Sequence, residues 1–216
     1  MTRRIAPSVL SADFSRLGDQ VQEVVDAGAS VLHIDVMDGR FVPPISMGAL
    51  VVSALRPRFA DLDIDVHLMV VEPERHVADF ATAGATGITV HAEATPHVHR
   101  ALGMVREHGC RAGLAVNPAT PLAVFGEVAC DLALLMTVNP GYGGQRFIPE
   151  SLERLRRLRH LVGDDVEIMV DGGIDATTAG PCAEAGATLF VAGNAVFGDA
   201  RPAEAYVRVA SAAGAR

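Results

Sequence analysis

The feature that most constrains the fold of this sequence is a series of eight short apolar, β-branched runs separated by longer segments with helical patterning. Such runs are typical of buried strands, and strands that alternate with helices favour a parallel sheet. The runs occupy residues 5–10, 31–36, 64–70, 87–91, 111–116, 132–138, 167–170 and 188–192. A count of eight predicts an α/β fold, a (β/α)8 TIM barrel formed by residues 1–216 as a single domain.

Residues at the expected helix starts support this alternation. Ser11 or Asp13 can cap the first helix, because their side chains accept hydrogen bonds from the free amides of a first turn. Proline suits the first helical position, where its missing N–H costs no hydrogen bond. The third, sixth and last expected helices begin at Pro73, Pro149 and Pro202.

The tripeptide Ala-Gly-Ala occurs at residues 27–29, 83–85 and 185–187, each time between a helical pattern and the next strand. Glycine at this position can adopt the left-handed conformation that ends a helix. Similar turns occur in open doubly wound sheets, but no GxGxxG motif follows the first strand. The sequence therefore favours the barrel over the open sheet.

Composition narrows the classes of partner. The chain has 216 residues, 50% of them hydrophobic, which suffices for one large core. Its net charge of −8, from 18 basic and 26 acidic residues, argues against nucleic-acid binding. The densest basic cluster, at residues 154–159, is expected to be the solvated face of a helix.

The cysteines and the N-terminus indicate where the protein works. Cys110, Cys130 and Cys182 are scattered and odd in number, which argues against a disulfide framework and fits a reducing cytoplasm. Each lies in a hydrophobic context, where a small buried residue is expected. The apolar stretch after Arg3 and Arg4 is too short for an export signal or a membrane span.

The octet LHIDVMDG, residues 32–39, carries ionisable groups on a strand that should be buried. Alternate side chains share a face of a strand, so His33, Asp35 and Met37 point the same way. Taken alone, the octet is equally consistent with a structural histidine beside a loop aspartate and with a functional site.

Further polar residues follow the ends of other expected strands, where TIM barrels place their active sites. Ser8, His67 and Asp171 occupy such positions, and they should converge on one mouth with His33 and Asp35. Two histidines and two aspartates form a ligand set for a divalent metal such as zinc, iron, manganese or cobalt. We therefore expect a metal site formed by His33, Asp35, His67 and Asp171.

Three glycine-rich segments lie late in the chain, at residues 139–145, 171–174 and 192–198. Each could be an ordinary turn, yet exposed backbone amides in such loops bind phosphate well. Barrels often hold a phosphate after their seventh and eighth strands. Together the three segments favour a phosphorylated ligand.

Three methionines, Met37, Met69 and Met136, fall at strand ends. Core filling is their default role, but at a site they would exclude water and strengthen electrostatic effects. His91 and Glu93 also lie at a strand end, and we assign them no role from the sequence.

These motifs resemble those of the ribulose-phosphate 3-epimerase family over essentially the whole chain. The matching segments are APSVLSADFSRL, HIDVMDGRFVP, DVHLMV, TVHAEA, MTVNPGYGGQ, MVDGGI and AGNAVF, in that order. The resemblance implies a (β/α)8 barrel that binds one divalent metal ion per subunit. It also implies inversion of C3 of D-ribulose 5-phosphate, giving D-xylulose 5-phosphate in the pentose phosphate pathway.

The resemblance further implies roles for individual residues. His33, Asp35, His67 and Asp171 would ligate the metal, with Asp35 as proton acceptor and Asp171 as proton donor. Ser8 and His67 would contact the sugar. The remaining substrate contacts, mainly to phosphate, would come from Gly141, Tyr142, Gly143, Gly144, Asp171, Gly172, Gly173, Gly193 and Asn194.

The sequence departs from the family pattern at a few positions. Serine is commoner than asparagine at the position of Asn194, so the backbone amide there is the expected contact. Pro44 and Tyr142 replace a common asparagine and phenylalanine, and both are compatible with the same loops.

Several alternatives remain open at this stage. The nearest is a 3-epimerase of a related ketose phosphate such as allulose 6-phosphate. A metal-dependent aldolase or decarboxylase would also form an enediolate, and a phosphosugar-binding protein would need no catalysis. The family forms dimers and hexamers, and the helix faces do not choose between these homo-oligomers.

Overall fold

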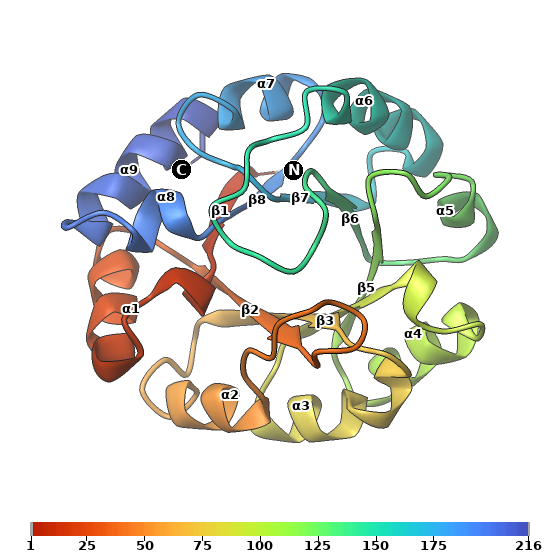
Figure 1. Cartoon of the computed structure of the whole chain (residues 1–216), viewed down its shortest axis with the longest axis horizontal. Helices are drawn as coiled ribbons and strands as arrows, with labels where there is room; N and C mark the ends of the chain where they lie inside the picture. The colour runs from red at the N-terminus through yellow and green to blue at the C-terminus, as the bar shows by residue number, and fades with distance from the viewer. Residues whose placement is uncertain (1, 216) are drawn as a thin grey trace.

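The computed structural model describes residues 2–215 and shows a barrel of eight parallel strands ringed by helices (Figure 1). The predicted α/β barrel is confirmed. The strands are β1 (Arg4–Pro7), β2 (Val31–Met37), β3 (Asp63–Met69), β4 (Gly87–His91), β5 (Arg111–Val116), β6 (Leu132–Met136), β7 (Glu167–Asp171) and β8 (Leu189–Ala192).

Helices follow the strands and cover the outside of the barrel (Figure 1). The α-helices are α1 (Leu17–Asp26), α2 (Ala49–Leu55), α3 (Val77–Ala83), α4 (Val98–Glu107), α5 (Val124–Glu127), α6 (Ser151–Val162), α7 (Ala179–Glu184), α8 (Asn194–Phe197) and α9 (Pro202–Ala213). Short 3-10 helices are η1 (Val9–Ser11), η2 (Phe14–Arg16), η3 (Pro73–Arg75) and η4 (Ala92–Ala94). Within residues 2–215, none of the helices combines the length and the apolar character needed to cross a membrane.

The sheet closes between its first and second strands. The hydrogen-bonded order runs β1-β8-β7-β6-β5-β4-β3-β2, so β1 and β2 lie at its two ends. An isolated parallel bridge between Ser8 and His33 joins these ends. The barrel seam therefore lies beside the LHIDVMDG segment.

The predicted strand ranges are largely confirmed. Residues 87–91 and 111–116 match β4 and β5, while each of the other six strands differs from its predicted range by one to three residues at one or both ends. The first strand ends at Pro7 rather than at residue 10, because Ser8 Oγ accepts from the Leu10 amide and starts η1. The sixth ends at Met136, since the amide of Thr137 bonds to the Asp171 carbonyl.

Several residues predicted to begin α-helices lie up to one turn before them. Asp13 caps η2, while α1 itself begins at Leu17, so the Ser11 or Asp13 cap predicted for the first α-helix is wrong. Pro73 begins η3, Pro149 precedes α6 by two residues, and Pro202 begins α9 as predicted. The left-handed turns of the Ala-Gly-Ala segments are confirmed, with φ values of 107°, 108° and 111° at their glycines.

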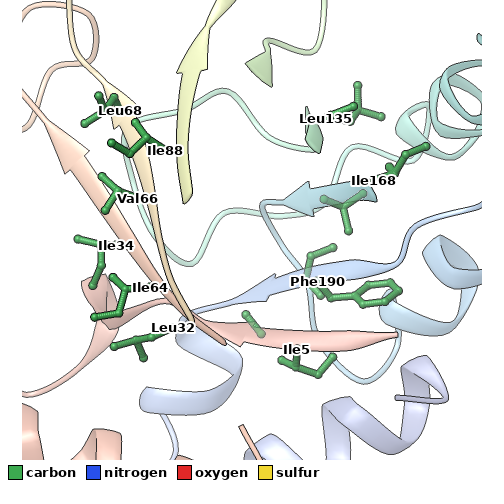
Figure 2. Packing of buried hydrophobic residues seen from close by; sticks show 14 of the residues in the cluster. Ile5, Leu32, Ile34, Ile64, Val66, Leu68, Ile88, Leu135, Ile168 and Phe190 are labelled. Carbon is green, nitrogen blue, oxygen red and sulfur yellow. The ribbon is translucent and has the colours of Figure 1, made fainter. Parts of the chain in front are cut away.

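The main core lies between the strands and the helices. Strand residues that face outward, such as Ile34, Val66 and Phe190, are buried there against the helix ring (Figure 2). A second, smaller cluster fills the barrel itself and includes Leu134 and Met169. Both faces of each strand are therefore buried, which explains the nearly continuous apolar runs in the sequence.

Four charged residues close the amino-terminal end of the barrel. Arg4 donates to Asp63 at 3.0 Å and to Glu167 at 2.9 Å, and Arg111 donates to Glu167 at 2.8 Å. These residues come from the odd-numbered strands β1, β3, β5 and β7, as one interior layer of a TIM barrel requires. The apolar interior of the barrel lies between this layer and the carboxyl ends of the strands.

Candidate active site

Four ionisable side chains meet at the carboxyl end of the barrel. His33 and Asp35 come from β2, His67 from β3 and Asp171 from β7, and one ligand atom from each lies within 4.8 Å of all the others. The two imidazoles are fully buried, and Asp35 is 4% exposed. Their inward direction follows from the alternation of side chains along each strand.

His33 presents one ring nitrogen to this cluster. Its Nδ1 lies 2.8 Å from Oδ2 of Asp65, a carboxylate that can only accept, so Nδ1 carries the hydrogen. In a neutral ring Nε2 then has a free lone pair, and within the described residues it has no hydrogen-bond partner although it is buried. Oδ1 of Asp35 lies 3.3 Å from it.

His67 faces the cluster with Nδ1, whereas His33 faces it with Nε2. Its Nδ1 lies 3.1 Å from Oδ1 of Asp35 and 3.6 Å from Oδ2 of Asp171. Its Nε2 lies 2.8 Å from Nε2 of His91. The two histidines of the cluster thus point different nitrogens at the same carboxylate.

The two aspartates of the cluster have opposite electrostatic environments. Burial raises the pKa of Asp35, but the positive charges of His33 and His67 and the hydrogen bond from His67 outweigh it and hold this pKa far below its usual range. Burial and the negative charge of Asp35 raise the pKa of Asp171 above its usual value. Asp35 therefore favours the ionised form, and Asp171 is displaced toward the protonated one.

The histidine environments favour a cation at the centre. Burial lowers the pKa of His33, yet Asp35 and Asp65 outweigh that effect and raise it well above its usual value. Burial lowers the pKa of His67, but the hydrogen bonds that its ring donates to Asp171 and Asp35 outweigh that effect and raise this pKa. A cation placed among these groups satisfies the same carboxylates.

The donor set fits a divalent metal ion. Two imidazole nitrogens and two carboxylates suit zinc, iron, manganese and cobalt. The buried Nε2 of His33 has no hydrogen-bond partner among the described residues, and its lone pair could bind a metal. His33, Asp35, His67 and Asp171 could therefore hold such an ion.

Two serines fix the position of Asp35. The hydroxyl of Ser8 donates to Oδ2 of Asp35 at 2.5 Å. The hydroxyl of Ser46 donates to the Asp35 carbonyl at 2.6 Å and accepts from the Met37 amide at 2.9 Å. The end of β2 is thus held by the loops after β1 and β2.

A cavity of about 600 Å³ opens over the cluster. Its floor includes Asp35 and Asp171, and Met37, Met69 and Met136 line it from the ends of β2, β3 and β6. Residues from all three glycine-rich segments also line it, including Gly141, Tyr142, Gly143, Gly144, Gly172, Gly173, Gly193 and Asn194. In Figure 1 the segment between β6 and α6 passes over the barrel.

Two of these loops fit together only with glycine. The hydroxyl of Thr137 donates to the carbonyl of Gly172 at 2.5 Å, which brings the loops after β6 and β7 together. Gly172 has a φ of 118°, and a Cβ there would lie 2.4 Å from Val138. A Cβ on Gly173 would lie 2.5 Å from the Phe147 amide nitrogen. The close approach leaves backbone atoms lining the cavity.

The structure brings together the predicted residues named above, and it adds others. The sequence does not predict the part played by Asp65 and Ser46, and it assigns no role to His91 and Glu93. Asp65 could have been found, because it lies two residues before His67 and so shares its face of β3. Ser46 comes from the loop after β2, and its contact with Asp35 depends on tertiary structure.

Comparisons with known proteins decide the family. The sequence profile described as the ribulose-phosphate 3 epimerase family matches residues 4–197. The chain belongs to this family. The ribulose-phosphate 3-epimerase of Synechocystis is 52% identical over 212 residues, covering 95% of this chain and 92% of that protein. The Bacillus subtilis ribulose-phosphate 3-epimerase is 49% identical over 201 residues, covering 90% and 92%.

Solved structures of low sequence identity share the fold. KGPDC from Streptococcus mutans matches with a TM-score of 0.76 at 15% identity, covering 99% of this chain and 98% of that one. The 3-hexulose-6-phosphate synthase of Salmonella typhimurium matches with a TM-score of 0.74 at 16% identity, covering 97% and 98%. At such identities the likeness concerns the barrel alone.

Proposed function

We propose that this chain is a metal-dependent isomerase that interconverts D-ribulose 5-phosphate and D-xylulose 5-phosphate by inversion at C3, a step of the pentose phosphate pathway. The observation that carries the proposal is the pair of carboxylates, Asp35 and Asp171, that reach one cavity from β2 and β7. The membership in the ribulose-phosphate 3-epimerase family supports the same reaction.

The chemistry needs two groups that exchange protons on opposite faces of the substrate. The C3 hydrogen lies α to the C2 ketone, so its removal leaves an enediolate, and return of a proton to the other face inverts the centre. Asp35, held ionised, is the proton acceptor from D-ribulose 5-phosphate, and Asp171 is the donor. In the reverse direction the two carboxyl groups exchange roles.

His33, Asp35, His67 and Asp171 would hold one divalent metal ion per subunit, with zinc, iron, manganese and cobalt as candidates. When bound, such an ion supplies positive charge that stabilises negative charge on the substrate oxygens. Ser8 and His67 would orient the sugar. The three methionines, Met37, Met69 and Met136, exclude water around the reacting carbons.

The phosphate would lie among the glycine-rich loops. Gly141, Tyr142, Gly143 and Gly144 border the cavity on one side, and Gly172, Gly173, Gly193 and Asn194 border it on the other. Backbone amides in these loops are suitable donors to phosphate oxygens. Among the described residues that line the cavity, Arg146 carries the one lysine or arginine side chain.

We also propose a cytoplasmic enzyme, a single catalytic domain per chain, and a homo-oligomer, either dimer or hexamer. The buried thiols are consistent with a reducing compartment. Light scattering on the purified chain measures the oligomeric state directly, and a monomer would contradict that part of the proposal.

A direct test is turnover of D-ribulose 5-phosphate in deuterated water. We expect D-xylulose 5-phosphate with deuterium at C3. Faster turnover of D-allulose 6-phosphate would instead indicate an epimerase for the six-carbon sugar. Release of a carbonyl fragment or carbon dioxide would indicate an aldolase or decarboxylase, and a lack of C3 exchange would indicate a binding protein.

A further inference from the structure

A line of hydrogen-bonding groups runs from His67 away from the cavity. Nε2 of His67 lies 2.8 Å from Nε2 of His91 on β4, and Nδ1 of His91 lies 3.2 Å from Oε2 of Glu93 in η4. The two imidazoles stack, with ring centroids 4.9 Å apart and an angle of 23° between their planes. Both histidines are fully buried.

The carboxylate of Glu93 determines which atom donates and which accepts in each hydrogen bond of this line. Its Oε1 accepts from the Asn117 amide at 2.8 Å and from the hydroxyl of Thr120. Burial raises the pKa of Glu93, but hydrogen bonds from His91 and Thr120 outweigh it and lower this pKa to about 2. An ionised carboxylate can only accept, so Nδ1 of His91 carries a hydrogen.

His91 therefore accepts at its other nitrogen. One hydrogen lies between two ring nitrogens 2.8 Å apart, so a His91 ring with hydrogen on Nδ1 has a lone pair on Nε2 when His67 is the donor. The 2.8 Å contact with His67 needs one donor, and only Nε2 of His67 can provide it. Nδ1 of His67 faces Oδ1 of Asp35 at 3.1 Å and Oδ2 of Asp171 at 3.6 Å, and a metal ion bound among these carboxylates would take the place of the Nδ1 hydrogen and use the lone pair of Nδ1.

We infer that His91 and Glu93 are positioning residues that hold His67 in its Nε2–H tautomer and so direct the Nδ1 lone pair to the metal. This inference rests on the metal site of the proposed function. Asp65 holds His33 in the opposite, Nδ1–H tautomer through a single contact. The two ligands thus have separate supports, a carboxylate for His33 and a histidine with a carboxylate for His67.

The support of His67 is anchored outside the barrel. Asn117 and Thr120, which hold Glu93, lie in the loop between β5 and α5, and Arg154 of α6 donates to the Thr120 carbonyl at 2.7 Å. Arg154 is thus partly buried rather than solvated, unlike the prediction for its helix face. The ring of Phe41 lies 4.8 Å from that of His91 and covers it.

The substitution Glu93→Gln tests this inference because it should exchange the donor and acceptor nitrogens of His91. The amide oxygen of glutamine would keep the contacts to Asn117 and Thr120, which places its NH2 group against Nδ1 of His91. His91 would then accept at Nδ1 and carry hydrogen on Nε2, in conflict with the Nε2–H of metal-bound His67. We expect the affinity for Zn²⁺ to fall about 10- to 100-fold.

Three further variants separate this effect from local damage. His91→Gln keeps an acceptor for His67, and its Zn²⁺ affinity should stay well above that of His91→Leu, which has none. Glu74→Gln is the matched control, because Glu74 is a partly buried carboxylate that accepts from Thr95 at 3.0 Å and belongs to a different contact network. We expect the parental Zn²⁺ affinity for this variant.

The measurements are Zn²⁺ competition against a chromophoric chelator and ring ¹⁵N chemical shifts of His91 in the zinc-loaded chain. We expect the His91 hydrogen to move from Nδ1 to Nε2 in the Glu93→Gln variant, which a merely structural role of Glu93 would not cause. An unchanged His91 tautomer, a Zn²⁺ affinity within about twofold of the parent, or equal affinities for His91→Gln and His91→Leu would overturn the inference.

The outcome also separates the inference from the proposed function. Zinc affinities that follow the expected order in a chain without epimerase activity would refute the function and support the inference. Epimerase activity in the parent chain, together with unaltered zinc binding in Glu93→Gln, would support the function and refute the inference. A parent chain that binds no Zn²⁺ would overturn the metal site and the role of His91 and Glu93 with it.

Discussion

The hydroxyl of Ser8 donates a 2.5 Å hydrogen bond to Oδ2 of Asp35, across the seam where β1 meets β2. The residue that closes the barrel therefore also holds the proposed proton acceptor. Oδ1 of Asp35 lies 3.1 Å from Nδ1 of His67, so the Ser8 contact with Oδ2 fixes the carboxylate in the orientation that directs Oδ1 toward His67. Seam closure and active-site geometry depend on each other.

Replacing Ser8 with alanine should slow the reaction without unfolding the chain. A hydrogen bond to a charged group contributes about 1.5–3 kcal/mol, so we expect kcat/KM to fall about 10- to 100-fold. Steady-state kinetics on D-ribulose 5-phosphate, with circular dichroism as the folding check, measures this. Parental kinetics would show that Asp35 needs no support from Ser8.

Asparagine at Asp35 or Asp171 should abolish most of the activity while the fold remains. Each change removes a proton-transfer group, worth about 10²- to 10⁴-fold, together with a proposed metal ligand. Asp61→Asn is the control, because Asp61 is exposed and lies outside the ligand cluster. Activity within about tenfold of the parent in either test variant would contradict the two-carboxylate scheme.

Removing the metal should lower both activity and thermal stability. A ligand at about 100 times its Kd stabilises the folded state by about 2.7 kcal/mol, which for a chain of this size is a Tm shift of about 5–10 °C. Thermal scans after chelation and after readdition of zinc, iron, manganese or cobalt check this. Full activity in a chain shown by elemental analysis to be metal-free would disprove the requirement.

Alanine at Gly113 should destabilise the barrel. A Cβ at this position of β5 would lie 2.1 Å from the Thr89 hydroxyl and 3.1 Å from its Cα, inside a fully packed interior. Overpacking of this kind costs about 1–3 kcal/mol, measurable by urea unfolding. The cost should shrink in a Thr89→Ala background, and additive effects would show that the two positions do not clash.

The three cysteines should resist alkylation in the folded protein. Burial raises the pKa of Cys182 to about 12 and, with Asp131, that of Cys130 to about 11. Burial also raises the pKa of Cys110. At about pH 8 a thiol of pKa 11 is thiolate in about one molecule per thousand, and the thiolate is the reactive form. Iodoacetamide followed by mass spectrometry should label the unfolded chain fully and the native chain slowly, whereas rapid native labelling would contradict this burial.

Local patterns in the sequence were enough to predict the architecture. A strand buried on both faces is a short apolar run in the sequence, so both ends of β4 and of β5 could be predicted without error. Helix starts were harder, because Asp13 caps a 3-10 turn that precedes α1 and nothing local distinguishes the two. The inward faces of β2 and β3 followed from their period of two.

The sequence by itself determined the strand count, the alternation with helices and the inward side chains of each strand, because these depend on local propensity and periodicity. Only the tertiary structure decided which polar groups meet. The contacts of Asp65 with His33 and of His91 with His67 join neighbouring strands, and their distances depend on barrel closure and strand stagger. Tautomers and opposed pKa shifts arise from such contacts, so they appear only once the chain is folded.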